Sequence, residues 1–555
     1  MADSTPASAT TPVRRLRWRF PVVVLLLGTF IFAIPWIWIT FESTDSESSI
    51  PNMEATLAEG AISFFMFTQW MTPMAMAALL ALWWVFFSGI AWSIRLLGMV
   101  LVVGLGVGFA LSIRNVELTT GRVGLIPSIE FIWDKSIDAT FDAATSADTG
   151  PKDDLPPIDA TIGDRDFPSY RGPKTDGVVS VPSFLDWSNT RPERLWTQPS
   201  PGGYSGVAVA GNIVVTILQR VDKQEEIIIC YDRATGKQRW THTYSAYHKD
   251  VMGDGPRATP TIHDNRIYSL GGMGDLVCLN VAGKKIWSAN ILKDSGAKKI
   301  QWGMTGSPLI VDGLVIVNSG VDPANPVGPS LLAYDAVDGA IRWKVGKRKA
   351  GYSSPQLATI AGVRQMLLFD GEGLAAYDPK TGSELWQHPW STQFEMNSIQ
   401  PVVLGDDRVF ISSELVNGCV MLKIKRADDG KWSTDVLWQH KKFAARYANL
   451  VTDGKRLYGL HNFSGILTCL DANDGSVIWK GARQGPGQLL LVNDMLLVVH
   501  GDTGHVSLFN TDGAELGQHR AFVEPYKTWN TLAIAGDRLF LRNQREIVCL
   551  KLPTR

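Results

Sequence analysis

Cysteine and histidine are the residues that most often bind a metal or haem, and in this chain neither is spaced for that chemistry. The chain has five cysteines, and none forms a CxxC or CxxCH motif, which argues against a zinc ribbon or an attached haem. Four cysteines open similar short segments, as in Cys230-Tyr-Asp and Cys469-Leu-Asp. We interpret them as inert, buried residues on separate repeats. The histidines show no HxxxH-type spacing, so no metal site is expected.

A second set of residues could bind a ligand without a metal. Cationic, aromatic and amide side chains precede the short apolar runs that we expect to form innermost strands. Such a mixture suits an anionic or sugar-like ligand, with Trp302 stacking and Arg257 and Lys527 contacting an anion. For each residue, the alternative is a packed or solvated loop position. The candidate ligand-binding residues are Arg257, Trp302, Tyr352, Asn397, Arg446, Tyr447, Lys527, Trp529 and Asn530.

Internal repeats provide the elements that must position these residues. Five segments match closely, including Tyr231–Trp240, Tyr377–Trp386 and Leu470–Trp479. Each predicts a strand, an Asp–Gly turn and a second strand that ends in tryptophan. A further hairpin lies upstream of each copy, as in Val207–Val215. Two hairpins make one four-stranded antiparallel blade.

The repeats predict an all-β, eight-bladed β-propeller over residues 166–555. Eight inner strands and eight outer strands can be counted along the chain. The last blade, which ends near Leu552, lacks an outer strand of its own, whereas Leu195-Trp196 has no inner strands before it. We therefore expect Arg194–Thr197 to close the last blade and pair its open edge. A linear solenoid, the alternative, leaves both half-blades unexplained.

The repeats resemble the quinoprotein-type (PQQ-like) propeller family, outlined as AxDxxTGxxxW, from Asp166 to Pro553. Segments such as Phe167–Pro173 and Gly351–Pro355 make the chain most similar to bacterial membrane-anchored PQQ-like and BamB-like propellers. That resemblance implies one of two functions. The first is a binding or scaffold module, and the second is a sugar or alcohol dehydrogenase that uses pyrroloquinoline quinone (PQQ) with calcium.

The dehydrogenase hypothesis finds little support in the residues. The resemblance implies a carboxylate base, oxygen ligands for calcium and an aromatic floor for the quinone. The chain has no vicinal cysteine pair, which the resemblance implies for the alcohol dehydrogenases but not for the glucose dehydrogenases. The repeats also stay too closely spaced for a long covering insertion. No catalytic residue and no cofactor are therefore assigned, and PQQ with calcium remains the alternative.

The N-terminal region predicts a membrane anchor of three transmembrane helices at about residues 20–41, 61–87 and 96–113. Residues 1–19 contain Arg14, Arg15, Arg17 and Arg19, whereas the loop over 42–60 has no Lys or Arg. This asymmetry predicts a cytoplasmic N-terminus and a periplasmic propeller at the bacterial inner membrane. A cleaved signal peptide, the alternative for the first span, fits poorly because two more apolar runs follow.

Residues 114–165 are expected to be a linker, because 143–162 is rich in Asp, Ala, Thr and Pro. With 53 basic and 54 acidic residues, the chain has no charge excess for binding nucleic acid. The sequence therefore favours a propeller that binds a protein, glycan or small ligand outside the cytoplasm.

Overall fold

The computed structural model describes residues 19–29, 71–121, 124–147, 155–181, 187 and 190–553, except for 323, 325, 393–394, 415–416, 463 and 524–525. The chain divides into two compact units. The first comprises Met1–Val116, Val123–Leu125 and Ile129–Asp134, and the second comprises the remaining residues.

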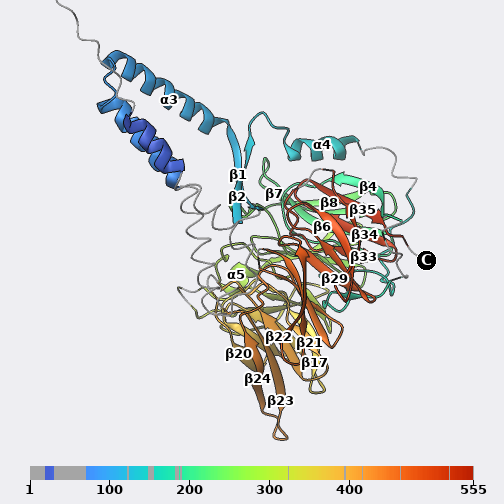
Figure 1. Ribbon diagram of the computed structural model, residues 1–555. Helices are drawn as coiled ribbons and strands as arrows, with labels where there is room; N and C mark the ends of the chain where they lie inside the picture. Colours follow the sequence, from blue (N-terminus) through green and yellow to red (C-terminus); the bar gives the residue numbers. More distant parts are fainter. Residues whose placement is uncertain are drawn as a thin grey trace, which may run out of the picture. The chain divides into compact units, whose positions relative to one another are not determined.

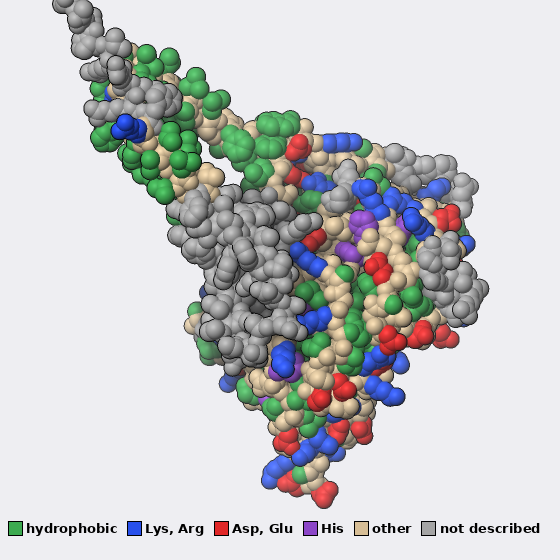
Figure 2. All heavy atoms as spheres, in the orientation of Figure 1, with side chains coloured by type: hydrophobic (Ala, Val, Ile, Leu, Met, Phe, Trp, Pro, Cys, Tyr) green, Lys and Arg blue, Asp and Glu red, His purple; other side chains and the backbone are tan. Residues whose placement is uncertain are grey.

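The first unit contains helix α3 (Trp92–Ser112), which has 21 residues and is long and apolar enough to cross a membrane. It is the one such helix among the described residues, and Figure 2 shows hydrophobic side chains over its surface. Two shorter apolar helices span Arg19–Thr29 and Met71–Phe86. The span predicted over 96–113 corresponds to α3. The spans predicted over 20–41 and 61–87 lie partly outside the described residues.

The range expected to be a linker contains ordered elements. Strands β1 (Ile113–Gly121) and β2 (Gly124–Phe131) form a hairpin, and helix α4 (Ile137–Ala147) follows. Phe141 of α4 is buried in the hydrophobic core, and Asp142 forms an ion pair of 2.8 Å with Lys223. Burial of Phe141 and this ion pair hold α4 against the propeller.

Eight sheets form the blades of a β-propeller, as the repeats predict, and each contains four antiparallel strands, with a fifth strand added in one blade. Blade 1 contains β5 (Ala208–Ala210), β6 (Ile213–Arg220), β7 (Glu225–Asp232) and β8 (Gln238–Ser245). Blade 2 contains β9 (Thr261–His263), β10 (Arg266–Leu270), β11 (Asp275–Asn280) and β12 (Lys285–Asn290), followed by helix α5 (Ile291–Ser295). Blade 3 contains β13 (Leu309–Val311), β14 (Leu314–Asn318), β15 (Leu331–Asp335) and β16 (Ile341–Val345). Blade 4 contains β17 (Gln356–Ile360), β18 (Val363–Asp370), β19 (Gly373–Tyr377) and β20 (Glu384–Pro389).

The second half of the ring repeats this order. Blade 5 contains β21 (Val402–Leu404), β22 (Arg408–Ser412), β23 (Cys419–Arg426) and β24 (Trp432–His440). Blade 6 contains β25 (Val451–Thr452), β26 (Arg456–His461), β27 (Ile466–Asp471) and β28 (Val477–Arg483). Blade 7 contains β29 (Gln488–Val492), β30 (Met495–Val499), β31 (His505–Asn510) and β32 (Glu515–Arg520), with β3 (Val178–Val179) as a fifth strand. Blade 8 contains β33 (Ala533–Ala535), β34 (Arg538–Arg542) and β35 (Glu546–Lys551).

The outer strand of blade 8 comes from the start of the propeller and closes the ring. Strand β4 (Glu193–Pro199) pairs antiparallel with β35, and Trp196 lies opposite Cys549. Figure 1 shows β4 beside the red C-terminal strands β34 and β35. The predicted closure of the last blade by Arg194–Thr197 is confirmed.

The repeated tryptophan packs one blade onto the next. The indole of Trp240 in blade 1 donates a hydrogen bond of 2.8 Å to the carbonyl of Val281 in blade 2. The same indole covers Gly283, where a Cβ atom would lie 2.5 Å from the ring. The turn glycine therefore supplies both a positive φ, +79°, and the space for the indole. Equivalent hydrogen bonds to the next blade are donated by Trp196, Trp287, Trp438 and Trp479.

A ring of hydrogen bonds surrounds the propeller axis where the innermost strands begin. The backbone N–H of Gly206 donates to Oγ1 of Thr259, whose own N–H donates to Oγ of Ser307. The pattern continues from blade to blade with distances of 2.7–3.4 Å. We call these residues the axial ring: Gly206, Thr259, Ser307, Ser354, Gln400, Asn449 and Gln488. Thr531 holds the equivalent position in blade 8 and lies next to Gly206.

Candidate ligand site on the propeller axis

A cavity of about 160 Å³ lies on the propeller axis, beside the axial ring. In seven blades, the residue two positions before the axial ring forms part of the cavity wall. This regularity arises because the loops before the innermost strands are similar and place equivalent residues at equivalent positions. The wall is mainly apolar and contains six aromatic side chains. These are Tyr170, Tyr204, Trp302, Tyr352, Tyr447 and Trp529.

Three of the aromatic rings form a continuous stack. The Trp529 ring lies between Tyr204 and Tyr447, with centroid distances of 5.7 and 5.5 Å and interplanar angles of 26° and 17°. Trp302 and Tyr352 form a second pair, with centroids 5.1 Å apart and planes tilted by 48°. Stacked aromatic walls bind flat, ring-shaped groups through dispersion and apolar burial.

Two cations stand at one end of the stack. The guanidinium of Arg257 lies 5.3 Å from the centroid of Tyr204 and donates hydrogen bonds to the carbonyls of Gly253 and Gly255. The ammonium of Lys527 lies 5.3 Å from the Tyr204 ring and 5.1 Å from the Trp529 ring. Cations over aromatic faces are stabilised by the ring quadrupole.

Lys527 is itself almost fully buried, with 1% of its side chain exposed. Its Nζ donates a hydrogen bond of 2.6 Å to the carbonyl of Met252 and lies 3.4 Å from Oε2 of Glu117. Burial lowers the pKa of Lys527 to about 8, and the carboxylate of Glu117 opposes that shift. Glu117, on the β1–β2 hairpin, carries no sequence signal that connects it with the propeller axis.

The remaining candidate residues surround the cavity without forming its wall. Arg446 lies 5.7 Å from the centroid of Tyr447 and 3.9 Å from Oε2 of Glu414. Asn530 is 1% exposed, and its Nδ2 donates to the carbonyls of Ser205 and Gly203.

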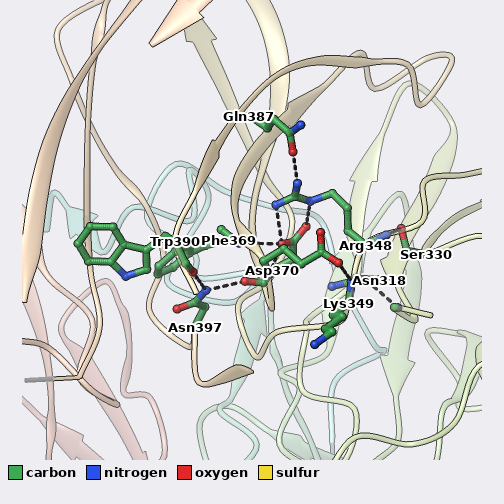
Figure 3. Close-up of polar contacts among 12 residues, drawn as sticks. Asn318, Ser330, Arg348, Lys349, Phe369, Asp370, Gln387, Trp390 and Asn397 are labelled. Carbon is green, nitrogen blue, oxygen red and sulfur yellow. Dashed lines mark hydrogen bonds and ion pairs between the residues drawn. The ribbon is translucent and has the colours of Figure 1, made fainter. Parts of the chain in front are cut away.

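Asn397 is fully buried and stabilises a loop of blade 4. Its Nδ2 donates hydrogen bonds of 2.7 Å to the carbonyl of Asp370 and 2.9 Å to that of Trp390. Figure 3 shows Asn397 between these two residues, with Arg348 bridging the Asp370 carboxylate and Gln387. The structure therefore brings Arg257, Trp302, Tyr352, Tyr447 and Trp529 to the cavity, and places Asn397, Asn530, Lys527 and Arg446 behind its wall.

One segment preceding the first blade closes the far end of the cavity. The backbone of Phe167 exchanges two hydrogen bonds with Val209 in β5. The hydroxyl of Tyr170 accepts a hydrogen bond of 2.8 Å from Asn449, and Nη2 of the buried Arg171 donates to the carbonyl of Leu450. These contacts fix Tyr170 as the floor of the cavity.

The donor set of the cavity does not fit PQQ with calcium. Calcium prefers six to eight oxygen ligands that include carboxylates, and no carboxylate forms part of the cavity wall. Among the residues that the structure describes, no group of three or more His, Cys, Asp or Glu side chains could hold a metal ion.

Comparison with known families gives one match over most of the propeller. A family model described as outer membrane protein assembly factor BamB matches residues 177–242 and 224–481. Outer membrane protein assembly factor BamB of Burkholderia pseudomallei (strain K96243) is 24% identical over 369 residues, which cover 62% of this chain and 85% of the relative.

Two solved structures are similar to this chain. The quinohemoprotein alcohol dehydrogenase of Comamonas testosteroni gives a TM-score of 0.50 at 12% identity, over 76% of this chain and 85% of that chain. BamB from Moraxella catarrhalis gives a TM-score of 0.45 at 14% identity, over 65% of this chain and 98% of that chain. At 12% identity the similarity to the dehydrogenase concerns the propeller fold alone.

Proposed function

Because the chain belongs to the family described as outer membrane protein assembly factor BamB, we propose that it is a membrane-anchored propeller that binds its ligand on the axis. The observation that carries this proposal is the aromatic cavity, closed by Tyr170 at its floor. Six aromatic side chains on the wall of one small cavity favour binding of an apolar or ring-shaped group.

The volume of the cavity accommodates one ring-sized group of a ligand. An apolar cavity of about 150 Å³ in another protein holds a single benzene molecule, and the cavity here measures about 160 Å³. Arg257 on its wall favours a ring that carries a negative or strongly polar substituent. The expected ligand is therefore a carboxylated aromatic ring or a sugar acid, either free or as part of a larger molecule.

Binding can be tested on the purified full chain in detergent with benzoate, indole-3-acetate and gluconate. We expect saturation-transfer NMR to detect binding of at least one of them. The variant Trp302→Ala should weaken it about two- to tenfold, since stacking contributes roughly 0.5–1.5 kcal/mol. Trp432→Ala, on the outer hairpin of blade 5, serves as the matched control. Absence of binding, or equal effects of both variants, would contradict the proposal.

We also propose that α3 anchors the protein in the bacterial inner membrane, with the N-terminus cytoplasmic and the propeller periplasmic. The arginines that precede the first apolar run and the apolar α3 support this topology. Alkaline phosphatase fused after Arg555 should be active, and a cytoplasmic reporter at the same position should be inactive. The opposite pattern would reverse the proposed orientation.

The same full chain distinguishes a binding module from a quinone-dependent dehydrogenase. Addition of PQQ and Ca²⁺ is expected to give no cofactor absorbance change and no dye reduction with glucose or ethanol. Tight stoichiometric binding together with turnover would favour the dehydrogenase.

A further inference from the structure

The innermost strand of each blade has one edge that faces the propeller axis, and the chain itself pairs with some of these edges. In blade 7, β3 runs parallel to β29, with Val178 and Val179 opposite Leu491 and Val492. The N–H of Leu491 donates to the carbonyl of Gly177, and that of Asn493 donates to the carbonyl of Val179. The axis-facing edge of β29 is therefore filled by an extended segment of the same chain.

The same segment also pairs with blades 1 and 2. Phe167 exchanges backbone hydrogen bonds with Val209 of β5, and the carbonyl of Pro168 accepts one from Ile262 of β9. Val209, Ile262 and Leu491 each lie three residues after the axial ring. The edges of these innermost strands are thus sites for an extended chain.

Strand β17 of blade 4 presents the same edge with no segment on it. Like β29, it has five residues, and Leu357 and Thr359 correspond to Leu491 and Asn493. Ile360 and Val363 flank a two-residue turn and therefore form a hydrogen-bonded pair. Because every second residue of an antiparallel strand bonds the same neighbour, Ala358 also bonds β18. The backbone groups of Leu357 and Thr359 then point the other way, to the axis. Within the described part of the chain, neither the N–H of Leu357 nor that of Thr359 forms a hydrogen bond.

This edge lies in an open groove of about 600 Å³. One side of the groove is formed by residues 173–176 and 178 of the N-terminal segment, and the other by β13, β17 and β21. Leu357 is half-buried, and Thr359 is exposed. A strand entering here would cover an apolar side chain and satisfy two backbone donors, as β3 does on β29.

We propose that the groove binds an extended segment of a partner protein, which adds to β17 as a parallel strand. The segment has alternating apolar side chains, because successive residues of a strand face opposite sides and Leu357 provides an apolar contact. This interaction surface does not depend on the aromatic cavity, because the groove and the cavity share no lining residue.

The experiment uses the purified full chain in detergent and a displayed library of random heptapeptides. Peptides that bind the wild-type protein are selected and resynthesised. We expect alternating apolar sequences whose binding weakens at least tenfold when alternate residues of the peptide are N-methylated. Hydrogen–deuterium exchange should slow at the amides of Leu357 and Thr359 in the complex.

Variants of the protein localise the site. Leu357→Arg blocks the groove, and Thr359→Pro removes one donor at an exposed position that is compatible with proline. Each should weaken binding at least tenfold, whereas Val337→Arg, at an exposed position of blade 3, should leave it unchanged. The proposal is overturned if no peptide is enriched, if N-methylation has no effect, or if the protected amides lie outside β17.

Discussion

The direction of a side chain near the axis depends on its distance from the axial ring. Tyr204, Tyr352, Tyr447 and Trp529 lie two residues before the ring and reach the cavity. Asn397 lies three residues before the ring and bonds backbone carbonyls behind the cavity wall instead. Successive side chains of an extended chain point to opposite sides, so a difference of one residue decides whether a side chain faces the cavity.

Sequence alone predicted most of the loops that meet at the axis, because the repeats fix where each innermost strand begins. It did not distinguish cavity-facing residues such as Tyr352 from structural residues such as Asn397. That distinction requires the register of the hydrogen bonds of the axial ring. Tyr204 shares the register of Tyr352 and could have been predicted, whereas the contact of Glu117 with Lys527 arises from tertiary folding.

The buried side chain of Glu226 should make the stability of the protein depend on pH. Its fully buried carboxyl accepts hydrogen bonds from the Tyr244 hydroxyl and the N–H of Gly272, and burial raises its pKa to about 7. Between about pH 4.5 and 7, the Glu226 carboxyl is therefore protonated in the folded state but ionised in the unfolded state. Stability from this group falls as pH rises through that range.

Replacing Glu226 by glutamine should remove this dependence. We expect the free energy of unfolding of Glu226→Gln, relative to wild type, to increase by about 2–3 kcal/mol between pH 5 and pH 8. Urea denaturation at both pH values measures this difference. Glu384→Gln, at an exposed position of β20, should show no such change. Parallel curves for wild type and Glu226→Gln would refute the assignment.

Asp370 and Arg348 form a buried ion pair with contacts of 2.5 and 2.9 Å (Figure 3). Asp370→Leu should destabilise the protein by about 3–5 kcal/mol, because it leaves a buried guanidinium without its carboxylate. The double variant Arg348→Met/Asp370→Leu should recover part of that loss. Thermal denaturation of both variants checks this, and a double variant less stable than the single one would be inconsistent with it.

At the scale of the elements, most blades are held to the next by a tryptophan and a turn glycine. The repeats revealed both residues, since the motif ends in tryptophan and contains glycine at one place. They did not show that the glycine of one blade receives the tryptophan of the preceding blade. The partner is set by how adjacent sheets twist and pack, which no single repeat encodes.

Two glycines with similar backbone conformations separate these effects. Gly283 has a φ of +79° and touches Trp240, whereas Gly313 has a φ of +75° and no neighbour within 4 Å of an added Cβ. Each change to alanine should cost about 1–2 kcal/mol for the positive φ. Gly283→Ala should lose a further 1–3 kcal/mol, roughly, through overpacking. Chemical denaturation gives both values, and equal losses would show that the indole contact contributes nothing.

At the scale of the whole molecule, stability depends on joining the two ends of the ring. The half-blades at Leu195-Trp196 and near Leu552 predicted this closure directly. The N-terminal segment that floors the cavity was not predicted, although Phe167–Pro173 stood out as a family segment. Its role depends on a path across the axis to Asn449 and Leu450, and local sequence does not specify such a path.

A pair of proline variants tests the closure. The N–H of Ser200 donates a hydrogen bond to the carbonyl of Arg545 in front of β35. Every second residue of an antiparallel strand bonds the same neighbour, so Gln198 also bonds β35, opposite Ile547, whereas the N–H of Thr197 faces away from β35. Gln198→Pro should cost at least about 1–3 kcal/mol, because the carbonyl of Ile547 loses its partner. It should also promote oligomers through the loosened edge. Thr197→Pro should have the smaller effect in calorimetry and light scattering, and equal effects would argue against β4 as the closing strand.

The closing strand β4 is synthesised long before the strand with which it pairs. A ribosome makes β4 about 350 residues before β35, which at about 5–20 residues per second leaves roughly 20–70 s between the two strands. During that interval β4 has no native partner, and the blades made meanwhile cannot close into a circle. We therefore expect the nascent protein to need a chaperone, or the charged residues Glu193 and Arg194, to keep this strand from pairing with another chain.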